Sequence, residues 1–143
     1  MKVRLEYKLV HPKAKLPTRA NLHDAASDLY AVESKVVAPG KTENIETGLI
    51  LSAPPGHYIT INGRSSLNKR GILAFRGIVD SGYLGTMKIS LTNTTDELYE
   101  VKAGDRVGQF TLHKCLEYDA VEVEEFSPEY STRGTKGFGS SGR

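Results

Sequence analysis

The feature of this chain that most restricts its fold is the spacing of its apolar residues, which nowhere keep a helical period over three turns. They gather instead in short, strand-like runs separated by turns that contain Gly and Pro. These runs span 3–9, 25–32, 45–51, 57–61, 107–112 and 121–123. Many short strands at regular spacing predict an all-β chain, built as an antiparallel sandwich or barrel. One short helix is favoured, at 65–69.

Length and charge set the broad class. The 143 residues suffice for one domain with a sizeable core. The 19 basic and 17 acidic side chains nearly cancel, and the few aromatics do not interleave with a basic stripe, so nucleic acid is not an expected partner. Cys115 is the only cysteine, which excludes an internal disulfide and favours a reducing compartment. Since no apolar run reaches membrane-spanning length, we expect a soluble, intracellular, cytoplasmic protein without a membrane partner, in the host cytoplasm if the source is viral.

A glycine-rich bend at 77–85, between the apolar runs 72–79 and 87–91, is the first candidate site. We interpret the two runs as strands joined at this bend. The bend carries one carboxylate, Asp80, and one aromatic ring, Tyr83. An ionised carboxylate can take a proton from water, and a flat ring can pack against a sugar or a base. The alternative is a solvated hairpin tip, in which Asp and Gly simply form the turn.

A second group of residues has the chemistry of phosphate binding. Arg64, Ser65 and Ser66 combine a guanidinium, two hydroxyls and the N–H groups of a helix start, although serines at such a place often serve only as caps. Gln109 adds an amide donor, or simply belongs to a hairpin turn entering a strand. Asp28 is either a carboxylate that holds a water on Mg²⁺, a cation that prefers oxygen ligands and retains water, or a surface turn residue.

The segment 127–143 also carries residue types that bind phosphate, here in a glycine-rich stretch. It holds four glycines, four serines and almost no apolar residues, so it should be mobile when free. Arg133, Ser140 and Ser141 offer a cation and hydroxyls, and Phe138 lies between two glycines, as in a lid that closes on a flat group; a frayed terminus is the alternative. Two phosphate-type clusters, two aromatics and one carboxylate together indicate a nucleoside polyphosphate as the ligand.

Other kinds of site fit the sequence poorly. Gly40-Lys41-Thr42 ends like a P-loop, but the required upstream glycine position is Lys35 and no long helix follows. The four histidines are widely spaced and no second cysteine is present, so a zinc site is not expected. Catalysis by Ser, His and Asp has no supporting elbow motif.

With these clusters in view, the chain resembles the trimeric dUTPase family. The resemblance runs from about Leu5 to Gly142 and rests on five motifs in the family's order, each weak alone and specific together. The motifs lie at 24–29, 63–67, 77–85, 104–109 and 133–142. The resemblance implies a jelly-roll-like β domain over 1–126 and a flexible arm over 127–143 that closes over a neighbouring active site. It also implies a homotrimer whose three sites are shared between subunits.

In the family, the third motif comes from one subunit, the first, second and fourth from another, and the fifth from the third subunit. The resemblance implies that Asp80 activates the water that attacks the α-phosphorus of dUTP, giving dUMP and pyrophosphate; this reaction limits uracil incorporation into DNA and supplies dUMP. Tyr83 would pack under the deoxyribose, Asp28 would orient the water shell of the cofactor Mg²⁺, and Phe138 would stack on uracil. The other implied substrate-binding residues are Gly77 and Gly139 and, at the phosphates, Arg64, Ser65, Ser66, Gln109, Arg133, Ser140 and Ser141.

The chain departs from the family's pattern at several positions, including Ser141, where threonine is usual. Lys136 stands where a glycine is common in the arm, and Ala74 stands where some members carry an asparagine that touches uracil.

The nearest rival function is dCTP deamination, which shares the fold and needs a glutamate where this chain has Ser90. A non-catalytic nucleotide sensor that kept the pocket is a second rival. A nucleic-acid-binding β domain is the third, and the sparse aromatics disfavour it.

Overall fold

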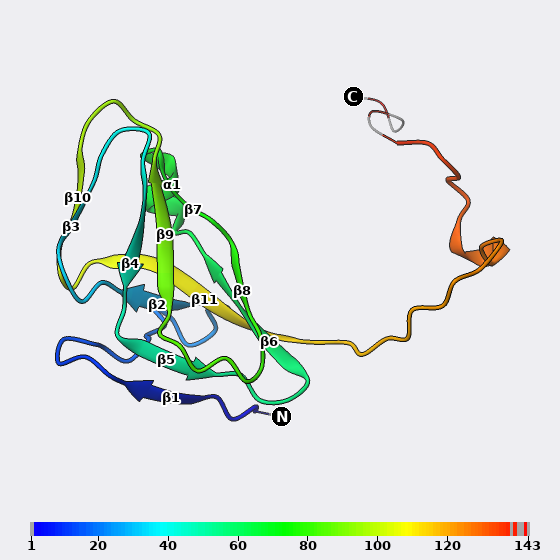
Figure 1. Ribbon diagram of the computed structural model, residues 1–143, viewed down its shortest axis with the longest axis horizontal. Coiled ribbons are helices and arrows are strands. Elements are labelled where there is room, and N and C mark those ends of the chain that lie inside the picture. The colour runs from blue at the N-terminus through cyan, green and yellow to red at the C-terminus, as the bar shows by residue number, and fades with distance from the viewer. Residues whose placement is uncertain (1, 138, 140–141, 143) are drawn as a thin grey trace.

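The structure, a computed structural model, describes residues 2–137, 139 and 142, and short strands make up most of its regular structure (Figure 1). The strands are β1 (Glu6–Leu9), β2 (Ser27–Tyr30), β3 (Lys35–Val37), β4 (Thr42–Glu46), β5 (Leu49–Ser52), β6 (His57–Asn62), β7 (Ile72–Ala74), β8 (Gly77–Val79), β9 (Lys88–Asn93), β10 (Tyr99–Val101) and β11 (Arg106–Lys114). The described helical elements are α1 (Ser65–Lys69) and a 3₁₀ turn, η1 (Pro128–Tyr130). Helix α1 has the bounds that the sequence predicts. Within the described residues, no helix is long and apolar enough to cross a bilayer.

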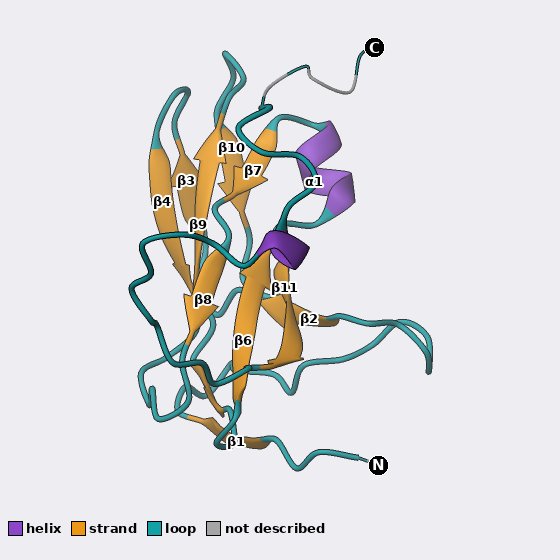
Figure 2. Ribbon diagram, turned by 90° about the vertical axis from the view of Figure 1, so that its right-hand side faces the viewer, coloured by secondary structure: helices purple, strands orange, loops and turns teal. Residues whose placement is uncertain are grey.

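The strands pair antiparallel throughout the described sheets. The largest sheet has the order β2-β11-β6-β8, and a three-stranded sheet has the order β4-β9-β7. Two further pairs, β1-β5 and β3-β10, complete the body. Figure 2 shows α1 beside β7 near one end of the body and β1 at the opposite end. The all-β, jelly-roll-like architecture expected from the sequence is therefore confirmed.

Apolar side chains from facing strands meet in one core. On β9, Ile89 and Leu91 are buried, whereas Lys88 is exposed and Ser90 half-buried, which is the alternation that the sequence predicts. The largest fully buried side chains come from several sheets and include Leu29, Val37, Ile45, Leu49, Leu51, Ile59, Met87, Ile89, Leu91, Val101 and Val107. Cutting a large aliphatic residue in such a core to alanine costs about 2–5 kcal/mol. The core therefore holds the strand register that positions the functional side chains.

The glycine-rich bend joins two strands that do not pair with each other. Strand β8 pairs with β6, whereas β9 pairs with β4 and β7, so the bend carries the chain from one sheet to another. The apolar run at 72–79 also divides into two strands, β7 and β8. The alternative of a simple hairpin tip is therefore wrong. Local alternation does not reveal this, because the choice of partner strand is made by distant residues.

The run at 45–51 is likewise two strands rather than one. It is broken at Thr47 and Gly48, where the Thr47 hydroxyl donates a hydrogen bond to the Met87 carbonyl (2.7 Å). Gly48 has φ +61°, and a Cβ added there would lie 2.4 Å from the His11 Cβ, so only glycine fits this crossing. The three-residue strands β3 and β10 are too short to leave a periodic pattern, and the sequence does not predict them.

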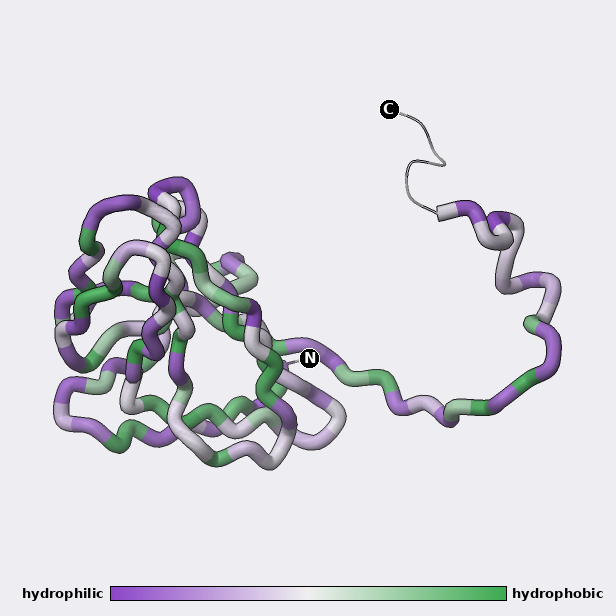
Figure 3. Tube along the Cα trace, turned by 45° about the horizontal axis from the view of Figure 1, so that its top comes forward, coloured by the Kyte–Doolittle hydropathy of each residue, from purple (hydrophilic) through white to green (hydrophobic). Residues whose placement is uncertain are grey.

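The chain after β11 leaves the body of the molecule. Residues 115–126 form no strand, so the strand expected at 121–123 is absent, and their side chains are exposed. Figures 1 and 3 both show this segment running outward, and Figure 3 shows hydrophobic and hydrophilic residues in turn along it. Tyr118 and Phe126 are 86% and 83% exposed. The pattern that predicts a strand is present, but no described residue of the chain pairs with it.

Candidate active site

Sheet register brings residues from distant parts of the sequence into one row. Asp28 on β2 lies opposite Gln109 on β11, and Gln109 lies opposite Asn62 at the end of β6. The chain then passes from β6 into α1 through Gly63 and Arg64. As a result, residues of three predicted motifs share one hollow of about 380 Å³. We call it the arginine–serine hollow; its lining is Ala20, Asp24, Ala25, Ala26, Asp28, Arg64, Ser65, Ser66, Arg106 and Gln109.

Asp28 organises the charges of this hollow. Its carboxylate oxygens lie 3.3 Å from Arg64 Nε and 3.5 Å from Arg106 Nη1. The Asp28 side chain is only 15% exposed and lies inside β2, so the alternative of a surface turn carboxylate is wrong. Arg64 Nη1 also donates to the Arg106 carbonyl (3.3 Å), and Gln109 Nε2 donates to the Gly63 carbonyl (2.9 Å). Two guanidiniums beside one carboxylate leave a positive surface that attracts anions.

The two serines do not cap α1. Arg64, in an extended conformation, is the N-cap of α1, and the cap makes no side-chain hydrogen bond. Ser65 and Ser66 follow in the first turn with exposed side chains, where backbone N–H groups also lack helical partners. Buried Leu67 anchors the helix to the core. The capping alternative is therefore wrong, and two hydroxyls face the same hollow as the guanidiniums.

Asp80 lies in a second hollow of about 270 Å³, the Asp80 hollow, whose other lining residues are Ile61, Gly77, Ile78, Val79, Tyr83, Thr86, Met87 and Lys88. Its carboxylate is exposed. The bend is tied down by a hydrogen bond from the Ser81 hydroxyl to the Ala53 carbonyl (3.0 Å) and by one from the Tyr83 N–H to the Asp80 carbonyl (3.2 Å). A Cβ added to Gly85 would lie 2.2 Å from the Tyr83 Oη, so the phenol rests directly on this glycine.

Within one chain the two hollows are far apart. They share no lining residue. On the shared sheet, Gly77 is opposite Ile61 and Val79 is opposite Ile59, so Asp80 extends toward the start of β6. Arg64, in contrast, follows the end of β6. Along β6, the positions of Asp80 and Arg64 are therefore separated by six residues of strand, or roughly 20 Å. Since a general base must reach its proton directly or through one water, an Asp80 that served as a base could not act on a phosphate held by Arg64 of the same copy.

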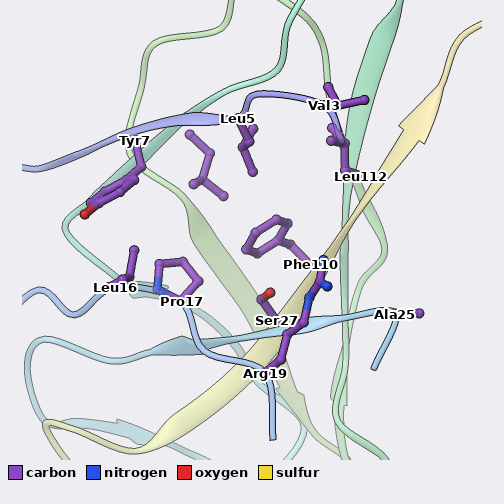
Figure 4. A pocket seen from close by; sticks show the side chains of 11 residues that line it. Val3, Leu5, Tyr7, Leu16, Pro17, Arg19, Ala25, Ser27, Phe110 and Leu112 are labelled. Atoms are coloured by element: carbon purple, nitrogen blue, oxygen red, sulfur yellow. The ribbon is translucent and has the colours of Figure 1, made fainter. Parts of the chain in front are cut away.

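A third hollow is apolar and contains none of the predicted site residues (Figure 4). Figure 4 shows Leu5 and Phe110 at its centre, with Arg19 beside Ser27 at one edge. Ser27 lines this hollow and Asp28 lines the arginine–serine hollow, because successive residues of β2 point to opposite faces. Most of the third hollow's lining is apolar, and its polar groups, among them Arg19 and Ser27, belong to none of the predicted site residues.

Those arm residues that the structure describes line neither hollow of their own chain. Arg133 is exposed and its Nε donates to the Lys136 carbonyl (2.6 Å), and Gly139 is exposed as well. Figure 1 shows this part of the chain apart from the body. Phe138, Ser140 and Ser141 lie outside the described residues. Their predicted contacts with uracil and the outer phosphates therefore stay predictions.

Two side chains that the sequence does not single out also line the hollows. Arg106 lines the arginine–serine hollow, and the only signal for it is its position inside the fourth motif. Lys88 lines the Asp80 hollow and its Nζ lies 3.9 Å from the Glu46 carboxylate, which also accepts a hydrogen bond from Thr86 (3.0 Å). No local pattern indicates Lys88, because it appears as the exposed position of an alternating strand.

An antiparallel β body with a basic, hydroxyl-lined hollow is typical of proteins that bind small phosphorylated molecules. Comparison with known proteins gives the family. Residues 12–142 match the model of the dUTPase family. A deoxyuridine 5'-triphosphate nucleotidohydrolase from Solibacter usitatus is 39% identical over 100% of this chain and 97% of the relative, and one from Arabidopsis thaliana is 40% identical over 94% and 81%. The dUTPase of Staphylococcus bacteriophage 80alpha, solved with dUPNHPP, has a TM-score of 0.92 at 26% identity over 99% of this chain and 100% of that one. The chain belongs to the dUTPase family.

Proposed function

We propose that this protein hydrolyses dUTP to dUMP and diphosphate, and so limits uracil incorporation into DNA and supplies dUMP. Family membership supports the substrate. The observation that carries the proposal is the arginine–serine hollow, in which residues from β2, α1 and β11 converge although they are distant in sequence. Guanidiniums, hydroxyls and backbone N–H groups are the donors that phosphate oxygens require.

In the proposed reaction, Asp80 accepts a proton from the water that attacks the α-phosphorus. The bond from the α-phosphorus to the bridging oxygen breaks, and diphosphate leaves with that oxygen. Arg64, Ser65, Ser66 and Gln109 hold the phosphate oxygens, while Gly77 and Tyr83 line the Asp80 hollow in which the sugar is placed. The Tyr83 ring would lie under the deoxyribose, where a 2′-hydroxyl has no room.

The distance between the two hollows supports a site that is shared between copies. Because Asp80 and Arg64 of one chain are roughly 20 Å apart along the sheet, the complete site requires the Asp80 hollow of one copy to face the arginine–serine hollow of another. Closed rings of identical subunits make such unlike surfaces meet. We therefore propose a homotrimer in which the arm, 127–143, extends from the domain 1–126 of the third copy. Phe138 would stack on uracil, and Arg133, Gly139, Ser140 and Ser141 would contact the outer phosphates.

Asp28 fits an indirect role toward Mg²⁺. Both of its carboxylate oxygens already face guanidiniums, at 3.3 and 3.5 Å, which disfavours direct binding of a cation. Mg²⁺ usually keeps several waters and takes substrate phosphates as ligands, so Asp28 is suited to hold its water shell. When bound, Mg²⁺ would neutralise charge on the phosphates. Among the described residues, no three His, Cys, Asp or Glu side chains gather into a metal site of their own.

The structure disfavours dCTP deamination as the alternative. Ser90, where the deaminase glutamate would be, lies on β9 and its hydroxyl donates to Asn44 Oδ1 at 2.6 Å. Strand β9 contains no acidic residue. The position is thus occupied by a cross-strand hydrogen bond between two neutral side chains, which cannot supply the required acid.

Turnover of dUTP with Mg²⁺ tests the proposal, with dCTP, dTTP and UTP as control substrates. We expect diphosphate from dUTP and little from the other three. Asp80→Asn keeps the size of the side chain and removes the base, so turnover should fall by about 10²–10⁴-fold, with the melting temperature and oligomeric size unchanged. Absence of dUTP turnover in the unaltered protein, or undiminished turnover in the variant, would contradict the proposal.

A further inference from the structure

A fourth hollow, of about 290 Å³, adjoins the arginine–serine hollow and reaches from the start of α1 to Arg70 just beyond its end. It shares Arg64, Ser66 and Arg106 with that hollow, and it adds residues to which no role has been given so far. We call it the arginine–tyrosine hollow; its lining is Arg64, Ser66, Leu67, Arg70, Tyr99, Asp105 and Arg106. Three of the seven lining residues are arginines and one is an acid, so the hollow is positively charged.

Arg70 supplies the charge that is not already compensated. Arg64 and Arg106 both face Asp28, but among the described residues no carboxylate forms an ion pair with Arg70. Its guanidinium instead lies 5.3 Å from the centre of the Tyr99 ring, a contact that fixes its position without neutralising it. Asp105, the acid in the lining, already accepts a hydrogen bond from the Lys102 N–H (2.9 Å). The three guanidiniums of the hollow therefore outnumber its single carboxylate.

Tyr99 adds a hydrogen-bond donor to the same wall. Burial raises the pKa of the Tyr99 phenol above its usual value, with Asp105 acting in the same direction and Arg70 and Arg64 opposing it. The phenol therefore keeps its proton at neutral pH. A protonated phenol and a guanidinium together can donate to several oxygens of one oligophosphate, and the planar guanidinium suits phosphate geometry.

We propose that the arginine–tyrosine hollow binds inorganic diphosphate, the leaving group of the reaction in the proposed function on which this inference rests. Arg64, Ser66 and Arg106 line both hollows, so the anion can pass from one to the other without losing contact with a guanidinium. Arg70 and Tyr99, which line only the arginine–tyrosine hollow, receive it there. The hollow is thus the exit site for one product, adjoining the nucleotide-binding surface and sharing three residues with it.

Calorimetric titration of the full-length, nucleotide-free protein with inorganic diphosphate and Mg²⁺ measures this site without any turnover. Arg70→Gln should weaken diphosphate binding about tenfold, equivalent to about 1.4 kcal/mol. The matched control is Lys69→Gln, which removes the same charge from the preceding position of α1, outside the hollow, and should change the Kd less than about twofold. Tyr99→Phe keeps the ring under Arg70 and removes the donor, and should weaken binding about threefold.

Melting curves show whether each variant is folded, and Arg70→Lys retains the charge if the glutamine variant unfolds. Binding that is unchanged in both Arg70 variants but lost in Arg64→Gln would place diphosphate in the arginine–serine hollow alone and overturn the proposal. Orthophosphate that binds as tightly as diphosphate would overturn the assignment to the leaving group. The proposed function fails separately: it falls if dUTP is not hydrolysed, whatever the calorimetry shows, whereas the site falls on the Arg70 titrations even in an enzyme that turns over dUTP.

Discussion

The arginine–serine hollow and the Asp80 hollow are held in place by different means. Asp28 and Gln109 are neighbours across one pair of strands, and Arg64 is fixed against Asp28, so the binding groups hold their mutual geometry inside one copy. Asp80 is exposed on a bend that connects two different sheets. The groups proposed to bind phosphate are therefore preorganised within one chain, whereas the placement of the proposed base depends on what the chain assembles with.

The largest expected effect comes from removing the arm, because it would cover both hollows in the assembled site. Deletion of 133–143 removes the ring proposed to stack on the base and one cation, contacts worth about 1–3 kcal/mol each, so kcat/KM for dUTP should fall about 30-fold to 10⁴-fold. Size-exclusion chromatography and melting curves should show the same assembly and stability, because the described part of this segment leaves the core untouched. Tyr130→Ala, upstream in the same exposed segment, is the control. Full activity without the arm would refute its role.

Arg64→Gln separates binding from chemistry. The change removes a guanidinium that we place on the phosphates, a charge-assisted contact of about 1.5–3 kcal/mol, and should raise the KM for dUTP about 10–100-fold. Because Asp80 lies in the other hollow, kcat should change much less. Steady-state kinetics beside Lys69→Gln make the measurement. If the loss appeared in kcat with KM unchanged, the division of labour between the two hollows would be wrong.

Gly85→Ala has the smallest expected effect on catalysis, and it changes the Asp80 hollow alone. A Cβ at this position meets the Tyr83 Oη at 2.2 Å, so the ring must move. Discrimination between dUTP and UTP should decrease up to about tenfold, the range that small changes of pocket shape produce. Gly82→Ala, on the same bend with no atom within 4 Å of the added Cβ, is a control for backbone strain, because its φ is +88°. Equal discrimination in the Gly85 variant and the unaltered enzyme would show that Tyr83 does not exclude the 2′-hydroxyl.

The sequence predicts those parts of the fold whose signals are local. Helix α1 begins and ends at the predicted residues, and the alternation on β9 matches its burial. The pairing of β8 with β6 rather than β9 could not be predicted, since it depends on contacts between strands distant in sequence. The break at Gly48 could not be predicted either, because it arises from the close approach of His11.

The same contrast between local signals and contacts distant in sequence applies to the candidate site. The chemistry of Arg64, Ser65, Ser66 and Gln109 predicts phosphate donors, and the four residues do line one hollow. Arg106 was not predicted, because its role comes from the pairing of β11 with β2, which brings its guanidinium to Asp28. The roughly 20 Å between Asp80 and Arg64 also needed the strand register. Motif order alone does not show which residues of one chain act together.

The most direct test of the central claim, a site built from two copies, is complementation between two inactive variants. Asp80→Asn retains an intact arginine–serine hollow, and Arg64→Gln retains Asp80. When the two are co-expressed in equal amounts and assemble at random, about a quarter of the sites in a cyclic oligomer combine both intact halves. The assay uses a dUTP concentration at which Arg64→Gln alone shows almost no turnover. Under that condition, turnover by the mixture should recover to about one quarter of the unaltered enzyme's value. A mixture no more active than the mean of its two components would contradict the shared site.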